Sequence, residues 1–267
     1  MGSLKQVRLT VLGSGTSVGV PTLGCQCRVC QSDDPRDKRL RPSVHIECDG
    51  FSILIDTAPD LRQQALRAGI RRIDAILYTH AHADHILGLD DVRPFNYHQK
   101  GPIPIYATAE TVEVIRRCFA YIFDQAESES SRPKLEVHLI DERPFTVGPL
   151  TFQPIPLWHG RGRSHGFRFG RVAYLTDHSE IPAESKQLLH GLDVLFLDAL
   201  RKRPHPTHST LEQALRIVEE LRPKRAYLTH ICHELGHEET ERELPQNVRL
   251  AYDGLQLIVP MAEGDHE

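Results

Sequence analysis

The sequence predicts an α/β chain of the α+β kind, an αββα sandwich in which two mixed β-sheets pack face to face and helices flank them. Strand-like apolar segments come in runs, with helical segments between them, and this pattern repeats loosely in two halves. The chain has 267 residues, of which 40% are hydrophobic, and this is enough to bury a large core. We therefore expect one domain over residues 1–267, with a Cys-rich loop at 21–42.

The elements of the first half follow one another in an order that suits a mixed sheet. Residues 7–12 alternate between apolar and polar side chains and predict a strand. Asp49-Gly50, a strong turn dipeptide, joins predicted strands at 44–48 and 52–55 into a hairpin. A helix is predicted at 60–68, with Asp60 as its cap and Gly69 as its stop. The further elements of this half are strands at 73–78 and 103–107 and a helix at 109–119.

The second half repeats this alternation after a polar segment at 125–134. That segment lacks apolar periodicity, and we interpret it as an exposed loop, with a lid over a functional site as the alternative. Ser209 or Thr210 is expected to cap a helix at 211–221. The remaining predicted elements are strands at 135–139, 145–147, 150–155, 172–176, 193–197, 225–229 and 255–259 and a helix at 183–189.

Composition excludes several classes of protein. The formal net charge of −4 gives no support to general nucleic-acid binding. The chain holds no apolar run of about 18 residues, so we expect no membrane span. Its first residues contain no apolar signal segment, so we expect a cytoplasmic protein. Its six cysteines are then expected to be thiols or metal ligands rather than disulfides.

The most informative motif is Thr79-His80-Ala81-His82-Ala83-Asp84-His85, which follows the predicted strand at 73–78. A buried strand that delivers three imidazoles and a carboxylate to its end needs a reason, because unpaired polar groups are costly to bury. Imidazole and carboxylate are ordinary ligands of zinc and other divalent metals. The backbone between them is too short for all four to converge on one tetrahedral ion. Two neighbouring ions fit better, with His80 and His82 on one and Asp84 and His85 on the other.

Three more predicted strands end abruptly in a residue of ligand type. These residues are His159, Asp177 and His230, and the last two follow a Leu-Thr pair much as His80 follows Tyr78-Thr79. We expect His159 to complete the first site and His230 the second, while Asp177 bridges both ions with its two oxygens. Core histidines bonded to the backbone are the alternative, but several such strand endings in one chain argue against it.

This ordered set of residues resembles the metallo-β-lactamase superfamily over about residues 7–258. The resemblance implies the metallo-β-lactamase fold and a hydrolase with two divalent catalytic metals, zinc or manganese. Two such metals can lower the pKa of a water, orient a substrate oxygen and stabilise developing charge. Asp84 is expected to orient the attacking water as well as bind metal. Ser43, His45 and Asp56 near strand ends are candidate supports for the ligands, with an ordinary structural role as the alternative.

A second metal motif is the segment 25–30, in which Cys25, Cys27 and Cys30 lie on a Gly/Pro-rich loop. In a reducing compartment this spacing indicates thiolate ligation of a structural zinc, and three unmetallated thiols are the alternative. A fourth ligand must come from elsewhere, and the candidates after His230 are Cys232, His233 and His237. The combination of Cys-x-Cys-x-x-Cys with Thr229-His230-Ile231-Cys232-His233 is similar to the PhnP-like phosphodiesterases of carbon–phosphorus lyase pathways. That similarity implies His233 as the fourth ligand.

Two further segments bear on the reaction. His208-Ser209-Thr210, after an acidic strand end at Asp198, resembles the phosphodiesterase branch of the superfamily, which includes tRNase Z. The resemblance implies that His208 is a general acid or phosphate ligand and that Asp198 orients it, with a capping-loop histidine as the alternative. Arg161 and Arg163, between glycines beside His159, could bind a substrate phosphate through paired N–H donors, and a solvated basic loop explains them equally well.

We therefore expect a dinuclear metal-dependent phosphodiesterase of the PhnP-like group that acts on a cyclic or small nucleotide-type phosphodiester. The first alternative is tRNase Z-like RNA processing, which would usually bring a basic extension that grips the substrate. The acidic segment 127–131 is a poor candidate for one. The second alternative is a lactonase or thioesterase, and the third is a zinc-clipped binding module without catalysis. The expected partner is a small phosphodiester, with no membrane and no nucleic acid, and a homodimer is left open.

Overall fold

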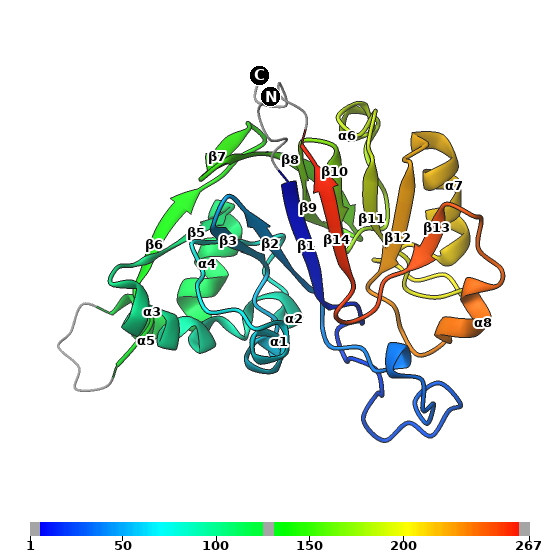
Figure 1. The fold of residues 1–267 in the computed structure, drawn as a ribbon, viewed down its shortest axis with the longest axis horizontal. Coiled ribbons are helices and arrows are strands. Elements are labelled where there is room, and N and C mark those ends of the chain that lie inside the picture. Colours follow the sequence, from blue (N-terminus) through cyan, green and yellow to red (C-terminus); the bar gives the residue numbers. More distant parts are fainter. Residues whose placement is uncertain (1–5, 125–130, 262–267) are drawn as a thin grey trace.

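The computed structural model describes residues 6–124 and 131–261, so most of the predicted loop at 125–134 lies outside the described residues. Two seven-stranded sheets face each other, and helices lie on their outer sides (Figure 1). This arrangement confirms the predicted αββα sandwich. Within 6–124 and 131–261, no helix is long and apolar enough to cross a bilayer.

The first sheet has the strand order β14-β1-β2-β3-β4-β5-β6. Its strands are β1 (Gln6–Gly13), β2 (Ser43–Cys48), β3 (Phe51–Ile55), β4 (Ala75–Leu77), β5 (Ile103–Ala107), β6 (Leu135–Leu139) and β14 (Gln256–Pro260). Pairings from β14 to β3 are antiparallel, and those from β3 to β6 are parallel.

The second sheet has the order β13-β12-β11-β10-β9-β8-β7. Its strands are β7 (Phe145–Val147), β8 (Leu150–His159), β9 (Gly162–Phe169), β10 (Val172–Leu175), β11 (Val194–Asp198), β12 (Arg225–Thr229) and β13 (Val248–Leu250). Pairings from β7 to β10 are antiparallel, and those from β10 to β13 are parallel. Counted from β1 and from β8, the two sheets repeat one series of pairings, and this is the two-fold pattern that the sequence predicts.

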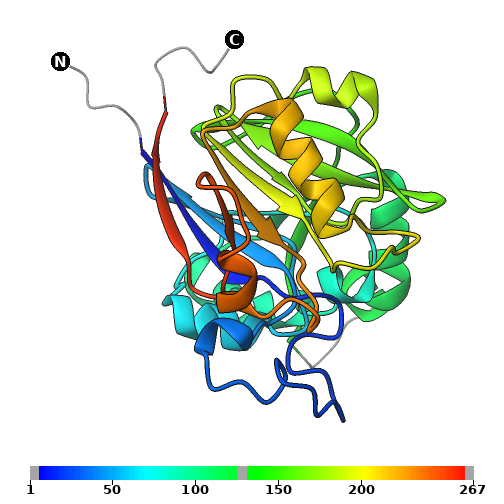
Figure 2. The same ribbon diagram turned by 90° about the vertical axis from the view of Figure 1, so that its right-hand side faces the viewer.

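The helices cover the two outer faces. They are α1 (Leu61–Ala68), α2 (Ala83–Ile86), α3 (Arg93–Gln99), α4 (Ala109–Cys118), α5 (Ala120–Phe123), α6 (Ala183–Gln187), α7 (Leu211–Leu221) and α8 (His237–Glu241), with 3-10 turns at Pro35–Asp37 and Leu89–Val92. Figure 2 shows α7 lying across the second sheet, against which it buries Leu211, Ala214 and Val218. Thr210 and Gln213 form a capping box at its start, as expected of a Thr cap.

Helix α1 begins and ends where the sequence predicts, but Asp60 does not cap it in the usual way. Gly69 ends the helix in the left-handed region at φ 67°, which glycine adopts without steric cost. Asp60 does not cap the helix with its side chain. Its two carboxylate oxygens instead accept hydrogen bonds from the backbone N–H and the guanidinium of Arg41, at 2.9 and 2.8 Å. Asp60 thus holds the predicted cap position, but a tertiary partner takes the carboxylate that would cap the helix.

The core between the two sheets is built from both of them. Val11 and Ile46 of the first sheet and Phe152 and Tyr174 of the second belong to one buried apolar cluster. Each sheet also packs against its own helices through a further apolar cluster. Full burial of side chains of this size contributes about 1.5–3 kcal/mol each, so the strands are held firmly where they end.

One strand pair differs from the prediction. Strand β8 is continuous to His159, where an apolar strand was expected to end although the strand itself was placed at 150–155, and β9 was not predicted at all. The two strands form a hairpin with His159 opposite Gly162, so only residues 160 and 161 turn. Gly160 takes φ 63°, which such a tight turn favours in glycine. The segment that the sequence suggested was a basic loop is thus mostly strand.

Candidate metal centre

The candidate centre lies at the edge where parallel strands of both sheets end. Asp56 follows β3, Asp177 lies just after β10 and His230 follows β12. All three have positive φ angles, of 64°, 51° and 57°. This region costs a non-glycine residue of order 1 kcal/mol, and such strain persists only where the surrounding structure determines it. The chain therefore bends sharply at each of these strand ends.

The first predicted group comes together as expected. His80, His82, His159 and Asp177 each offer an atom within 4.8 Å of those of the others. His82 Nδ1 lies 3.2 Å from His159 Nε2. Asp177 Oδ2 lies 3.8 Å from His80 Nε2 and 4.0 Å from His159 Nε2. Side chains from the β4 end, the loop that follows it, the β8 end and the β10 end thus converge on one point.

The second predicted group shares Asp177 with the first. Asp84, His85, Asp177 and His230 also offer atoms within 4.8 Å of one another, and all four side chains are buried. His85 Nε2 lies 3.2 Å from Asp177 Oδ1 and 3.3 Å from Asp84 Oδ2. His230 Nε2 lies 3.3 Å from Asp177 Oδ2 and 3.5 Å from Asp84 Oδ2. Asp177 lies between the two groups, where a bridging carboxylate was predicted.

The buried atoms at the centre fit divalent cations. His80 Nε2, His85 Nε2, His230 Nε2 and Asp84 Oδ2 have no hydrogen-bond partner among the described residues, although each is inaccessible to water. Burying polar atoms without partners is costly, and a cation coordinated by them removes that cost. The donor set of imidazole nitrogens and carboxylate oxygens suits zinc or another first-row divalent metal.

The protonation states also suit metal binding. Burial lowers the pKa of His80 well below its ordinary value and lowers that of His159 to about 4, so both rings are neutral and present a lone pair. Burial alone would lower the pKa of His85 and His230 as well, but Asp177 and Asp84 outweigh it, and the pKa of His230 rises to about 9. The two carboxylates thus favour positive charge at this second group.

Neighbouring groups hold three of these rings with Nε2 toward the centre. His85 Nδ1 donates to Asp56 Oδ2 at 2.7 Å, and Asp56 also accepts from the Thr79 hydroxyl at 2.8 Å. Since that hydroxyl gives its proton to Asp56, it accepts from His80 Nδ1 at 3.0 Å. His159 Nδ1 donates to the Thr207 carbonyl at 2.7 Å. In metal sites such outer partners fix the tautomer and the orientation of the ligand ring.

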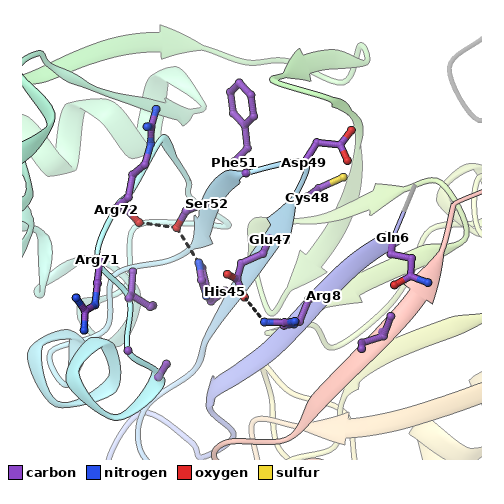
Figure 3. Close-up of a pocket in the computed structure, with 15 residues that line it drawn as sticks. Gln6, Arg8, His45, Glu47, Cys48, Asp49, Phe51, Ser52, Arg71 and Arg72 are labelled. Atoms are coloured by element: carbon purple, nitrogen blue, oxygen red, sulfur yellow. Dashed lines mark hydrogen bonds and ion pairs between the residues drawn. The ribbon is translucent and has the colours of Figure 1, made fainter. Parts of the chain in front are cut away.

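Of the three residues expected to support the candidate ligands, Asp56 and Ser43 lie near them and His45 does not. Asp56 contacts a candidate ligand directly, and the Ser43 hydroxyl donates to the carbonyls of Ile55 and Asp56 at 3.1 and 2.9 Å. His45 lies elsewhere, in a separate pocket of about 480 Å³ on the first sheet (Figure 3). Its Nε2 is 2.7 Å from Ser52 Oγ, which donates to the Arg72 carbonyl. The suggestion that His45 supports the metal ligands is therefore wrong.

His208 lies beside the centre with its predicted partner. Its Nδ1 donates to Asp198 Oδ2 at 2.8 Å, and its Nε2 lies 4.0 Å from Asp177 Oδ2. The ring stacks on His230, with centroids 4.5 Å apart. Asp198 is fully buried and also accepts from the His178 backbone N–H at 3.0 Å, which fixes its carboxylate. The ring of His208 is thus oriented with one nitrogen facing the two groups of candidate ligands.

The structure separates the two predicted arginines. Arg163, on β9, lines a pocket with His80, His82 and His159. Its guanidinium lies over the Trp158 ring at 4.4 Å. Arg161 is exposed in the hairpin turn and is not among the residues that line this pocket. Only Arg163 is therefore placed to meet a substrate at the candidate centre.

The predicted thiolate cluster also comes together. Cys25, Cys27 and Cys30 have Sγ atoms 3.2, 3.5 and 3.5 Å from His233 Nδ1. The pKa of Cys27 falls to about 6, chiefly because its sulfur accepts the Cys30 backbone N–H, and this favours the thiolate that binds zinc. The alternative ligand His237 is turned away, since it begins α8 and its backbone N–H donates to Asp37. The structure thus selects His233.

Sequence reasoning missed Arg39, which joins the Cys-rich loop to the segment after His230. Its side chain is fully buried and donates to the carbonyls of Cys232 and Leu235 at 3.1 and 2.8 Å. It also pairs with Asp37 at 2.9 Å. Nothing in the local pattern marks this arginine, because its carbonyl partners lie 193 and 196 residues away in the chain.

Taken together, this fold and these groups of histidines and aspartates define a metal-dependent hydrolase. The match to the beta-lactamase superfamily domain covers residues 52–231, and the chain belongs to this superfamily.

Individual relatives show which members of the superfamily this chain is similar to. A solved diphosphatase from the PhnP family is 52% identical, with a TM-score of 0.91, over 96% of this chain and 98% of its own. An octanoyltransferase from Porphyromonas gingivalis is 40% identical over 95% of this chain, but the chain spans only 52% of that relative's length. A ribonuclease Z from Mycolicibacterium gilvum is 25% identical over 89% of each chain. The likeness to the PhnP-family structure extends along nearly the whole of both chains.

Proposed function

We propose that the protein is a dinuclear metal-dependent phosphodiesterase of the PhnP-like group, which hydrolyses a small or cyclic phosphodiester. The observation that carries this proposal is His208, an imidazole outside the two predicted ligand groups, whose Nδ1 is fixed by buried Asp198 and whose Nε2 faces Asp177. Cleavage of a phosphodiester expels an alkoxide, which needs a proton, and a positioned imidazole supplies one. The 52% identity to a PhnP-family diphosphatase supports the same branch of the superfamily.

The metal-binding roles follow from the two groups described above. We assign one ion to His80, His82 and His159 and a second to Asp84, His85 and His230, with Asp177 shared between them. Two divalent ions, zinc or manganese, supply a nucleophilic water of lowered pKa and stabilise charge on phosphoryl oxygens when they are bound. A separate structural zinc is assigned to Cys25, Cys27, Cys30 and His233.

The protein's own residues then have distinct tasks. Burial would raise the pKa of Asp84, but His85 and His230 hold it well below its usual range, so this carboxylate is ionised and can orient the attacking water. Arg163 binds a phosphate oxygen from the first-group side of the site. His208 protonates the leaving oxygen with an Nε2–H that faces the substrate, and Asp198 accepts from Nδ1 and so fixes the orientation of the ring.

Hydrolysis tests with five substrates examine the proposal. Bis-p-nitrophenyl phosphate, a 2′,3′-cyclic nucleotide, a lactone and a thioester are offered to the same metal-analysed sample, together with a pyrophosphate diester because of the PhnP-family relative. We expect turnover of the phosphorus esters and none of the carbon esters. Hydrolysis of the lactone or thioester alone would contradict the proposal, since attack at carbon in those substrates does not call for the His208–Asp198 pair.

RNA processing is the second candidate, because several curated relatives of 25–30% identity are ribonucleases Z. The net charge of −4 argues against a large RNA substrate. Filter binding with tRNA at two salt concentrations separates the two candidates, because a tRNA-processing enzyme retains the RNA with a steep salt dependence. We further propose that the protein works in the cytoplasm, where the cysteines of the thiolate cluster stay reduced.

A further inference from the structure

The ring of His230 has no outer partner of the kind that fixes three of the other candidate ligands. Its Nε2 lies 3.3 Å from Asp177 Oδ2, but its Nδ1 is inaccessible to water and makes no hydrogen bond in the part of the chain that the structure describes. When Nε2 binds a cation through its lone pair, the ring proton must lie on Nδ1. A buried N–H without an acceptor costs about 1–3 kcal/mol, so His230 requires an acceptor on this side.

Two buried oxygen atoms in the second sheet also lack partners among the described residues. They are Asp198 Oδ1 and Thr229 Oγ1. Asp198 ends β11, Thr229 ends β12, and the two residues are opposite each other where these strands pair. Each comes two residues after an aromatic residue of the core between the sheets, Phe196 in β11 and Tyr227 in β12, so both side chains point to that same face. The two oxygens therefore lie side by side, just before the chain bends at His230.

The distance between Asp198 and His230 suits a bridging molecule rather than a direct bond. A carboxylate oxygen of Asp198 lies within 4.8 Å of a nitrogen of His230, and among the described atoms no hydrogen bond joins the two residues. Two hydrogen bonds of about 2.8 Å that meet at one oxygen atom span roughly 4.5 Å, because the angle between them is close to tetrahedral. A single water molecule therefore fits between Asp198 and His230.

Neither side chain is free to close this distance by itself. Asp198 Oδ2 accepts from His208 Nδ1 at 2.8 Å and from the His178 backbone N–H at 3.0 Å, so a turn of the carboxylate would break both bonds. The His230 ring lies nearly parallel to that of His208, at 13° with centroids 4.5 Å apart, and this stacking holds it in place. The packing thus keeps Asp198 and His230 at a distance that only a third group can bridge.

The side chain of His178 is a further sign of polar surroundings in this region. The ring is fully buried, and neither of its nitrogens has a hydrogen-bond partner within 6–124 and 131–261. Its backbone is anchored, since the N–H donates to Asp198 and the carbonyl accepts from the Ser209 hydroxyl at 3.2 Å. Polar groups that are buried together without protein partners are the usual surroundings of an internal water.

We propose that one buried water molecule joins His230 Nδ1, Asp198 Oδ1 and Thr229 Oγ1. Asp198 thereby positions two imidazoles, His208 directly and the candidate ligand His230 through the water. The water accepts from His230 Nδ1 and donates to the two oxygens, which gives it the about three hydrogen bonds that buried waters usually make. The inference rests on the proposed function, because it uses the ligand role of His230 and the proton-donor role of His208.

Zinc titrations of the metal-stripped protein test the part of Thr229. Thr229→Val keeps the shape of the side chain and removes its oxygen, so the water loses one of its three partners. We expect zinc binding by the group that contains His230 to weaken by about 2- to 10-fold, as the loss of one hydrogen bond allows. Thr229→Ser keeps the oxygen and should retain native affinity, which would not follow if only the packing of the threonine mattered.

Thr10→Val is the matched control, because Thr10 is a buried threonine of β1 in the other sheet. It should leave zinc affinity unchanged. The thiolate cluster serves as an internal reference, since its zinc binding should be the same in every variant. Native affinity of a folded Thr229→Val protein, or equal weakening by Thr229→Val and Thr229→Ser, would refute the role of the hydroxyl.

Asp198→Asn and His208→Ala separate the two tasks of Asp198. Loss of the His208 ring leaves all three partners of the water in place, so zinc affinity should stay native. The asparagine must keep its oxygen toward the N–H groups of His208 and His178, so its NH₂ group replaces Oδ1 and the water can no longer donate there. We expect this variant to bind zinc about 10- to 100-fold more weakly at the group that contains His230, as loss of an outer partner commonly does. Native affinity would show that Asp198 positions His208 alone.

A crystal structure of the zinc-loaded protein keeps this inference separate from the proposed function. We expect a water oxygen within about 3.2 Å of His230 Nδ1, Asp198 Oδ1 and Thr229 Oγ1. If no phosphodiester is hydrolysed but this water and the order of zinc affinities are found, the proposed function fails and the water link stands. If diesters are cleaved and His230 Nδ1 bonds directly to a protein atom or has no water beside it, the water link is refuted.

Discussion

Replacement of Asp56 by asparagine tests how the buried carboxylate controls the candidate ligand His85. In the native protein, Asp56 Oδ2 accepts from His85 Nδ1 at 2.7 Å and from the Thr79 hydroxyl at 2.8 Å, while Oδ1 accepts from the Thr79 N–H at 2.9 Å. All three neighbours are donors. An amide presents one oxygen and one NH₂ group, so one of its two ends must place a donor against a donor, whichever way it turns.

The backbone is not the reason for the expected effect. Asp56 has φ 64°, and asparagine tolerates this left-handed region about as well as aspartate does. If the NH₂ group faces His85, the ring is driven to carry its proton on Nε2, which points at Asp84 and Asp177. A proton there blocks the lone pair that a metal needs.

The magnitude follows from the lost bonds. A hydrogen bond to a charged group is worth about 1.5–3 kcal/mol, and about 1.4 kcal/mol changes an equilibrium constant tenfold. We therefore expect Asp56→Asn to weaken binding of the ion held by Asp84, His85 and His230 by about 10- to 100-fold, as loss of an outer partner commonly does. Titration calorimetry of metal into the stripped protein measures this directly.

Asp74→Asn is the control, because Asp74 accepts the Ser52 backbone N–H at 2.9 Å near the opposite end of β4. It should not change metal affinity. Circular dichroism and thermal melting of the stripped variants show whether each is folded. A folded Asp56→Asn protein with native metal affinity would refute the reasoning, since the tautomer of His85 would then not depend on Asp56.

The remaining predictions concern three other residues. Cys27→Ser should lower the melting temperature and the zinc content of the protein. Full zinc content with an unchanged melting temperature would show that the thiolate cluster does not bind a structural zinc. His208→Ala should keep both catalytic metals but lose about 10²–10⁴-fold in turnover of a phosphodiester, with a smaller loss for a p-nitrophenolate leaving group that needs little protonation. A uniform loss across leaving groups would indicate phosphate binding instead, lost metal would make His208 a ligand, and unchanged activity would favour the lactonase alternative. Arg39→Met should destabilise the protein by about 3–5 kcal/mol in chemical denaturation, because it removes the positive charge that pairs with the buried Asp37 carboxylate and leaves two carbonyls without their donor. An unchanged midpoint would show that the Cys-rich loop is held by other contacts.

The positions of the candidate ligands could be predicted from the sequence because their pattern is local. His80, His159, Asp177 and His230 lie where apolar strands end, and His82, Asp84 and His85 follow within the next few residues after His80. Parallel strands in one sheet end at the same edge. Asp177 and His230 therefore had to lie close together once β10, β11 and β12 were recognised as parallel neighbours. The three cysteines were visible for the same reason, since six residues contain them all.

Contacts between distant segments could not be predicted in this way. His45 looked like a support for the ligands, but β2 runs antiparallel to β3 and carries His45 away from the edge toward Ser52. Arg39 has no local signature, because burial makes it important and its carbonyl partners come from the far end of the chain. The strand β9 was missed because its charged residues conceal the alternation that predicts a strand.

The sequence by itself thus determined which residues stand at strand ends and which chemistry they carry. Only the tertiary structure decided how these residues are oriented and what surrounds them. The tautomers of His80, His85 and His159 depend on hydrogen bonds to partners that the fold brings near, and the pocket of about 500 Å³ beside the first group is lined by residues of α4 and β9 that lie far apart in the sequence. Periodicity and spacing record which face of an element is buried, whereas hydrogen-bond partners and cavities arise only when separate elements pack.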